Sequence, residues 1–215
     1  MARHRILLGA AMMVLAAAPL KAQRVEDWQY RWFWGARAGM VSYTLPTSGR
    51  QFTGEAGAEW LITARRVALH IGYDQSFTGA ADTFAVKGLS GTNNAVSFDG
   101  MRQIQIDVVA IIGDKQLQPY IGGGFVIETL TNARTTQVPF SQATQNNVSA
   151  AASGGFMHII AGAQYRMGKK AAIFANYSFT SQGRDFLLAG SAMTIQGGIR
   201  YAFLGAKEND PTNRR

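Results

Sequence analysis

The sequence contains no cysteine, few prolines and few charges for its length. Charged residues are 16% of 215 residues, below the quarter or so of a soluble domain. The absence of cysteine excludes a disulfide framework, a thiolate metal site and a lipid-anchored N-terminal cysteine. The sequence also lacks a phosphate-binding loop, a zinc-ligand spacing and a paired-carboxylate motif. We therefore predict no metal, no cofactor and no catalytic residue, and expect that the protein is not an enzyme.

After the N-terminus, no hydrophobic run is long enough for a transmembrane helix. The N-terminus itself has a basic start at Arg3 and Arg5, an apolar run over residues 6–18 and small residues up to Ala22. This pattern is typical of a secretory signal peptide, and the run is shorter than the roughly 18 residues needed to span a bilayer. We predict that residues 1–22 are removed on export.

The formal net charge of +8 indicates no nucleic-acid partner. Removing Arg3, Arg5 and Lys21 with the signal peptide leaves +5, and the remaining basic residues are scattered rather than grouped with aromatic residues in a stripe. The full sequence is 47% hydrophobic, and the part that follows the signal peptide is expected to be exported and contains no candidate membrane helix. Such a chain can span a bilayer only as a closed β-barrel, because every backbone polar group within the lipid must be hydrogen-bonded.

Apolar and polar residues alternate with period two in eight segments, as expected of strands with lipid on one side and a polar interior on the other. In the third segment Leu69 and Ile71 share a face opposite His70. Three connections between segments are short, at 63–66, 113–116 and 167–170, and two are long and polar, at 76–100 and 130–154. Eight strands of about 9 to 11 residues predict an all-β, eight-stranded antiparallel up-and-down transmembrane β-barrel over residues 23–203, with short turns in the periplasm.

The last segment carries a pattern of its own. Gln196 and Gly198 stand on the polar face, while Tyr201 and Phe203 end the apolar face. The spacing resembles the C-terminal signal that the assembly machinery reads in bacterial outer-membrane barrels. The resemblance implies that Gln196, Gly198, Tyr201 and Phe203 form the assembly signal, followed by a short periplasmic tail at 204–215.

Two further stretches are similar to the OmpA/OmpX-type eight-stranded outer-membrane barrels. They are the opening strand at 31–39 and the Pro-Tyr-Ile-Gly-Gly-Gly stretch within 118–125. The resemblance covers residues 28–203 and implies the outer membrane of a Gram-negative-type bacterium, with lipid and lipopolysaccharide as surroundings. Larger members carry a peptidoglycan-binding domain after the barrel, and we expect none here because only 12 residues follow Phe203.

Two soluble architectures compete with this interpretation. A lipocalin-like barrel would carry its apolar row inside, around a greasy ligand. The polar row of this chain is made of Gly, Gln, Asp, Glu, Arg and His, which suits such a cavity poorly, and the apolar row is too continuous to face water. A soluble β-sandwich would leave the signal peptide and the aromatic final strand unexplained.

The polar row predicts a packed interior, because eight strands enclose only enough space for their own side chains. If 45–50 is a simple hairpin, Arg37 lies opposite Glu59, and a two-residue turn at Ala64-Arg65 places His70 beside Glu59. The complete predicted interior network comprises Arg37, Glu59, His70, Asp107, Glu128, Arg166 and Arg200. Buried charges must be paired, so a structural network closing the lumen is the favoured interpretation, and a gated ion path is the alternative.

Three functions remain open at this stage. The first is a structural or surface-interaction protein that meets an extracellular ligand through the loops at 76–100 and 130–154. The second is a narrow channel for ions or small solutes. The third is a lipid-A-modifying hydrolase, which would need a nucleophile and a base; His70 and His158 both fall on the inward row, and the seventh strand lacks a His-x-Ser motif.

Basic pairs mark two of the short turns. Arg65-Arg66 and Lys169-Lys170 either contact anionic periplasmic partners or lipid headgroups, or are solvated turn charges that help to set the topology. We favour the second interpretation.

Overall fold

The computed structural model describes residues 28, 30–84, 94–113, 115–136, 141–168, 170–188 and 190–205. The predicted signal peptide and residues 206–215 of the predicted tail lie outside these ranges. Residues 204 and 205, which we assigned to the tail, belong to the last strand.

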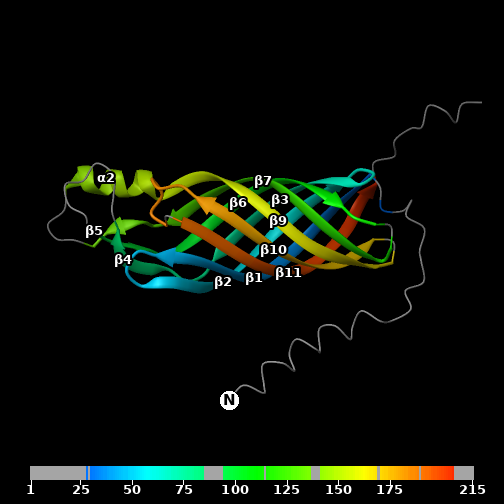
Figure 1. The fold of residues 1–215 in the computed structure, drawn as a ribbon, viewed down its shortest axis with the longest axis horizontal. Coiled ribbons are helices and arrows are strands. Elements are labelled where there is room, and N and C mark those ends of the chain that lie inside the picture. The colour runs from blue at the N-terminus through cyan, green and yellow to red at the C-terminus, as the bar shows by residue number, and fades with distance from the viewer. Residues whose placement is uncertain are drawn as a thin grey trace, which may run out of the picture.

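Eight antiparallel strands form a closed barrel in which each strand pairs with the next barrel strand along the chain, and β11 pairs with β1 (Figure 1). The strands are β1 (Arg31–Leu45), β2 (Gly49–Thr63), β3 (Val67–Ser76), β6 (Gly100–Ile111), β7 (Leu117–Thr131), β9 (Ser153–Met167), β10 (Ala171–Gln182) and β11 (Gly190–Gly205). The predicted fold class is confirmed. The described part of the chain holds no helix that is long and apolar enough to cross a membrane.

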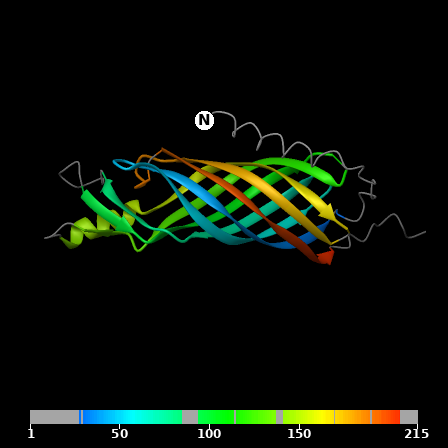
Figure 2. The same cartoon turned by 90° about the horizontal axis from the view of Figure 1, so that it is seen from below.

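The two ends of the barrel differ, as the connection lengths predict. At one end, here the turn end, β2 joins β3, β6 joins β7 and β9 joins β10 through three to five residues. At the other end, here the loop end, the strands run on into further structure (Figures 1 and 2). The strands are 10 to 16 residues long, so the prediction of 9 to 11 residues was too short for most of them. The excess extends β1, β7 and β9 beyond the length a bilayer requires.

The loop end is a folded cap, which corrects the expectation of two solvated loops. It contains β4 (Ala80–Phe84), β5 (Asn94–Phe98), β8 (Arg134–Thr135) and the helix α2 (Gln142–Ala151). Strands β4, β5 and β8 form a second sheet, and α2 begins where the Ser141 hydroxyl accepts a hydrogen bond from the Thr144 backbone N–H at 3.1 Å. Figure 2 shows this layer continuing the long axis of the barrel.

The cap has its own hydrophobic core, drawn from all four connections or the strand ends beside them. The buried members are Val41, Tyr43, Leu45, Phe84, Val96, Phe98, Met101, Leu130, Val148, Ala152, Phe186, Leu187, Leu188 and Ala192. Burial of a large apolar side chain stabilises by about 1.5–3 kcal/mol, enough for several together to hold a small layer of this kind on the barrel. The apolar residues that form this core are widely spaced among polar residues in the sequence. For this reason the sequence pattern predicts solvated loops rather than a folded layer.

Asp82 fastens the β1–β2 turn to the edge of β4. Its carboxylate accepts hydrogen bonds from the Thr47 and Ser48 backbone N–H groups, both at 3.0 Å, and from the Thr47 hydroxyl. Partial burial would raise the pKa of Asp82, but the hydrogen bonds from Thr47, Ser48 and the Thr83 backbone outweigh it and hold the pKa at about 2.

We expect this docking to weaken in acid. A carboxyl whose pKa is lower in the folded than in the unfolded state stabilises above the unfolded pKa, so the contribution is lost as the pH falls from about 4 towards 2. The protection factors for amide hydrogen exchange at Thr47 and Ser48, taken relative to the intrinsic rate at each pH, should therefore fall in that interval, and Asp82→Asn should show the lower protection factors already at pH 7. Asp99→Asn, which changes another cap carboxylate, is the control. Equal exchange in the Asp82 variant and the parent would contradict the assignment.

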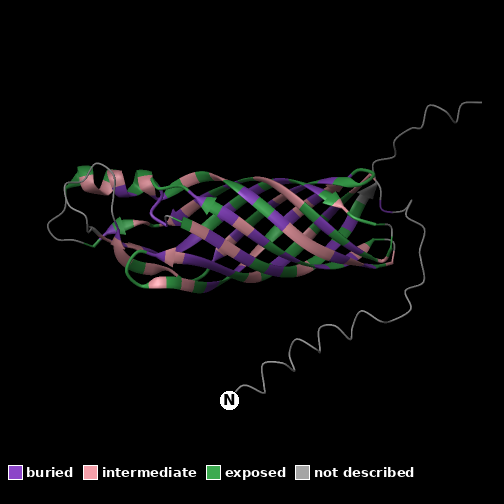
Figure 3. Ribbon diagram, in the orientation of Figure 1, coloured by how far each residue is buried: buried purple, intermediate pink, exposed green. Residues whose placement is uncertain are grey.

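The outer wall of the barrel is apolar, with inward and outward residues alternating along every strand as predicted (Figure 3). Exposed large apolar side chains cover it, including Ile104, Ile106 and Val108 on β6. Near the turn end, aromatic rings gather: Trp60 stacks on Trp34 at 5.5 Å, and Tyr201 meets Phe203 at 5.1 Å. A belt of aliphatic residues edged by aromatic rings is suited to a bilayer and its interface.

Candidate functional site

The lumen of the barrel is the candidate site, and its side chains form layers. A charged network fills the middle, amide and hydroxyl groups lie towards the loop end, and an apolar layer fills the turn end. That apolar layer comprises Trp28, Phe33, Leu61, Ala68, Val109, Tyr120, Ile160, Ala172 and Ala202. The inward rows predict a packed polar core, and the structure adds an apolar layer to that core at the turn end.

Arg37 lies at the centre of the charged network. Its guanidinium donates to both oxygens of Asp74, from Nε at 2.8 Å and from Nη2 at 2.5 Å. With its amide oxygen turned towards the guanidinium, Gln105 accepts two more hydrogen bonds, at 3.0 and 2.8 Å. A planar guanidinium paired with a carboxylate in this bidentate way is a strong, directional contact.

Glu59 connects Arg37 and Arg200. Arg200 donates to both oxygens of its carboxylate, the Nη2–Oε2 distance being 3.3 Å, and Arg37 Nη1 lies 3.7 Å from Oε2. Arg200 also donates to Gln164 at 2.8 Å and lies over the Phe174 ring, 3.9 Å from its centroid. The Glu59 side chain is completely buried, so its charge is compensated by these contacts rather than by water.

The predicted pairing of these residues needs correction in its register. Arg37 is opposite Gly57, and Glu59 is opposite Gly35 and Gly72. The turn between β2 and β3 comprises residues 64–66 rather than 64–65. The long side chains meet diagonally across the sheet, so Arg37, Glu59 and His70 come together although none of them is directly opposite another.

Asp107 joins the network to two histidines. His70 Nδ1 lies 3.1 Å from Asp107 Oδ2, and its Nε2 lies 3.2 Å from Glu59 Oε2. His158 Nδ1 lies 2.8 Å from the other Asp107 oxygen. Asp74 and His158 were on the predicted inward rows but not in the predicted network. The strand registers bring each within reach of its partner across a glycine: Gly57 lies between Arg37 and Asp74, and Gly124 lies between Asp107 and His158.

Glu128 and Arg166 lie apart from the central network. Glu128 accepts hydrogen bonds from Gln103 at 2.9 Å and Gln182 at 2.6 Å, towards the loop end. Arg166 lies at the turn end, where it donates to the Lys115 carbonyl at 3.3 Å. The structure thus brings together Arg37, Glu59, His70, Asp107 and Arg200, five of the seven residues in the predicted set.

Glycines make space for the large interior side chains. A Cβ at Gly72 would overlap the Arg37 guanidinium, and a Cβ at Gly162 would come within 2.7 Å of the Tyr120 ring. Both glycines are inward-facing strand residues. Their role here is spatial, since a strand glycine commonly marks the close approach of another group.

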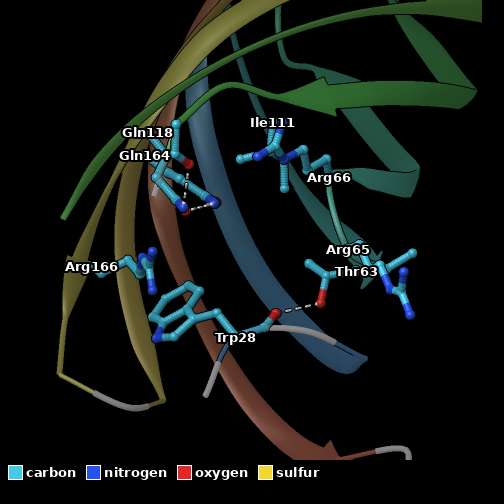
Figure 4. Close-up of a pocket in the computed structure, with 10 residues that line it drawn as sticks. Trp28, Thr63, Arg65, Arg66, Ile111, Gln118, Gln164 and Arg166 are labelled. Atoms are coloured by element: carbon cyan, nitrogen blue, oxygen red, sulfur yellow. Dashed lines mark hydrogen bonds between the residues drawn. The ribbon is translucent and has the colours of Figure 1, made fainter. Parts of the chain in front are cut away.

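Trp28 covers the turn end of the lumen (Figure 4). Its indole stacks on Phe33 at 4.8 Å and donates to the Gly168 carbonyl at 3.2 Å, and its own carbonyl accepts from the Thr63 hydroxyl at 2.7 Å. The Arg166 guanidinium faces the ring at 5.2 Å from its centroid. Trp28 therefore contacts three parts of the barrel wall at once. Trp28 was not among the predicted interior residues, because it stands before the first alternating segment.

The chemistry of the network is that of ion pairing. Both histidines point into the lumen and contact the Asp107 carboxylate. They therefore lie away from the outer surface, where a lipid substrate would bind. Among the described residues, no group of three or more His, Asp and Glu is arranged to hold a metal ion.

Comparison with known structures supports the fold. Neisserial surface protein A matches with a TM-score of 0.55 at 11% identity, over 80% of this chain and 97% of that one. The fold is that of a small outer-membrane β-barrel. Two other outer-membrane barrels match more loosely: Ail of Yersinia pestis with a TM-score of 0.48, 11% identity and 81% and 99% coverage, and OprG of Pseudomonas aeruginosa with 0.47, 12% and 82% and 98%. No protein-family model and no curated protein matches the sequence.

At these identities the likeness concerns the architecture. The predicted resemblance to the OmpA/OmpX-type barrels is confirmed at that level.

Proposed function

We propose that this outer-membrane barrel is a non-conducting surface protein that presents its folded cap to the outside of a Gram-negative-type cell. One observation carries the proposal: the lumen is packed with side chains while the loop end has a hydrophobic core of its own. A barrel that served only as a conduit would not need a structured layer across one mouth. The turn end then faces the periplasm, as short turns do in this class of barrel.

The cap offers a surface suited to contact with an extracellular partner. The exposed face of α2 carries Gln142, Asn146 and Ser149 and no charge, while its buried Val148 holds the helix on the cap. The long loops at 76–100 and 130–154 supply most of this layer. A rigid, hydrogen-bonding surface loses little conformational entropy on binding, which favours recognition.

The outer wall contacts lipid and, on the cap side, lipopolysaccharide. Tyr201 and Phe203 point outwards, while Gln196 is buried and donates to Glu55 at 2.8 Å. A Cβ at Gly198 would overlap the Ala36 carbonyl. The residues of the terminal signal therefore also pack in the folded barrel. We propose that the assembly machinery recognises the signal before the strands close.

The first test is electrical. We expect purified protein in a planar lipid bilayer to show no unitary conductance steps, because the apolar layer and the ion-paired network leave no continuous aqueous path. The Trp28→Ala and Glu59→Gln variants test whether any current depends on the lumen. Reproducible steps in the parent protein would overturn the non-conducting proposal and favour the channel.

The second test concerns the cap. In a strain that lacks the protein, the full chain and a variant with Gln142, Asn146 and Ser149 replaced by Lys should both give heat-modifiable migration in gel electrophoresis, since these side chains are exposed. Only the full chain should restore the phenotype of the loss. Restoration by both would remove the α2 surface from the proposal. Unchanged lipid A mass spectra with and without the protein would exclude the hydrolase.

A further inference from the structure

Four polar side chains cross the outer wall of the barrel near the loop end, on four neighbouring strands. In direct register, Gln75 on β3 is followed by Arg102 on β6, Thr129 on β7 and Ser153 on β9. These four residues, here the outer polar row, stand at outward positions in the alternation of their strands. The next outward residue after Arg102 on β6 is the exposed Ile104, so the outer polar row borders the apolar belt.

Hydrogen bonds within the outer polar row hold the Arg102 guanidinium by one nitrogen. Gln75 accepts from Arg102 Nε at 2.9 Å, and the Gln75 amide nitrogen donates to the Ser76 carbonyl at 2.8 Å. In the described part of the chain, the two Nη groups of Arg102 have no recorded protein partner. The Thr129 and Ser153 hydroxyls lie 3.0 Å apart, and because only one O–H serves that contact, the other remains available as a donor.

Among the described residues, Arg102 has no carboxylate partner on the wall. Every Asp and Glu of the eight barrel strands is buried in the lumen, namely Glu55, Glu59, Asp74, Asp107 and Glu128. The nearest exposed carboxylate along the chain, that of Asp99, lies 3.5 Å from the Arg134 guanidinium and accepts from Asn132 at 2.9 Å. A charge that faces lipid is costly unless it reaches water or an opposite charge. The counter-charge of Arg102 therefore comes from outside the protein.

The depth of Arg102 on the wall matches that of a lipid headgroup. Ile106, which we place near the bilayer midplane, lies four residues further along β6. At about 3.4 Å per residue and a strand tilt of about 40°, these residues lift Arg102 about 10 Å towards the cap. The apolar band of such a barrel is about 25 Å tall, so its edge lies about 12 Å from the midplane. The long arginine side chain bridges this difference and places its charge among the headgroups.

We propose that the outer polar row binds a phosphate group of lipid A, with Arg102 as the main ligand. A guanidinium that Gln75 holds at Nε can offer both Nη groups to two oxygens of one phosphate, a geometry that lysine cannot reproduce. Thr129 lies directly opposite Arg102, so the two side chains start about 5 Å apart and reach the same headgroup. The choice of lipid A rests on the proposed function, because only an outward-facing cap puts the row in the leaflet that carries lipopolysaccharide.

Native mass spectrometry of the folded barrel in detergent measures the binding, with bisphosphorylated lipid A as the probe. We expect Arg102→Gln to lower the apparent affinity at least about fivefold, the loss of one charge-assisted contact, and Arg102→Lys to lower it less. The matched control is Arg50→Gln, which removes the same charge from another outward position, where the guanidinium contacts the Met193 sulfur at 3.3 Å. Arg50→Gln should leave the affinity unchanged. Heat-modifiable migration shows that each variant is folded.

Two further lipids identify the source of the phosphate. Dephosphorylated lipid A should bind the parent no more tightly than bisphosphorylated lipid A binds the Arg102→Gln variant. Phosphatidylglycerol, which carries a phosphate without the sugar, should bind the parent more weakly than bisphosphorylated lipid A, because it offers no sugar hydroxyls to the Thr129–Ser153 pair. The ratio of the two affinities is read from the same spectra.

Three results would overturn the lipid A site. The first is an equal affinity of the parent and of Arg102→Gln for bisphosphorylated lipid A. The second is an equal loss in Arg102→Gln and Arg50→Gln, which indicates general attraction by positive charge. The third is phosphatidylglycerol binding as tightly as lipid A. The readout is independent of conductance and of the α2 surface, so the site can fail while the proposed function stands, and the reverse also holds.

Discussion

Glu59→Gln should lower the free energy of unfolding by about 3–5 kcal/mol, the range for breaking one side of a buried ion pair. Glu59 is the only carboxylate recorded within ion-pair distance of Arg200 in the described part of the chain. Without the charge of Glu59, the recorded hydrogen-bond partners that remain for Arg200 are the neutral side chains of Gln164 and Tyr120, and the introduced amide can offer only a neutral oxygen. Arg37 is less affected because Asp74 still pairs with it. Urea titration of the protein in phospholipid vesicles measures the change.

Glu55→Gln is the matched control. Glu55 is as deeply buried as Glu59, but its recorded hydrogen bond is with the neutral Gln196 amide, at 2.8 Å. We expect a loss below about 1.5 kcal/mol, the worth of a single neutral contact. The double variant Glu59→Gln/Arg200→Met should cost less than the sum of the two single changes, since each single change leaves a buried charge behind. Equal losses for Glu59→Gln and Glu55→Gln would contradict a network held by ion pairs.

Ile106→Arg should lower the stability of the barrel by about 2–4 kcal/mol, the cost of an arginine at the bilayer midplane. Ile106 lies on β6 between Ile71 on β3 and Phe125 on β7, and its side chain is 52% exposed on the outer wall. An arginine there cannot turn inwards, because the next residue, Asp107, already occupies the lumen face. Folding into vesicles of defined bilayer thickness, followed by urea titration, measures the change in the free energy of unfolding.

The control for this prediction is an exposed residue at a different depth in the bilayer. Phe77 is also exposed but lies at the loop end, just after β3. We expect Phe77→Arg to cost no more than about 1 kcal/mol, because near the interface the side chain reaches water and headgroups. Equal costs at both positions would mean that the apolar belt is not centred on Ile106.

The barrel wall could be predicted from the sequence because its signal is local. A strand with lipid on one side and packed polar groups on the other must alternate, so Leu69, His70 and Ile71 were assigned to their faces from neighbouring residues alone. The short turns and the closing strand followed in the same way. The cap could not be predicted, because residues such as Val96, Val148 and Leu188 show no period and meet only after the barrel brings their loops together.

The interior network depends both on the local sequence pattern and on contacts between distant residues. The amino-acid pattern predicts the barrel, the facing of its strands and the set of charges that must share the lumen, since period-two alternation leaves no other place for them. Which charges pair follows from the three-dimensional arrangement, because the register places Arg37 opposite Gly57 rather than Glu59 and the pairing of β3 with β6 brings His70 to Asp107. It alone also placed Trp28 across the mouth, through contacts with residues up to 140 positions away. Alternation is a property of adjacent residues, whereas register, closure and plugging depend on contacts between distant ones.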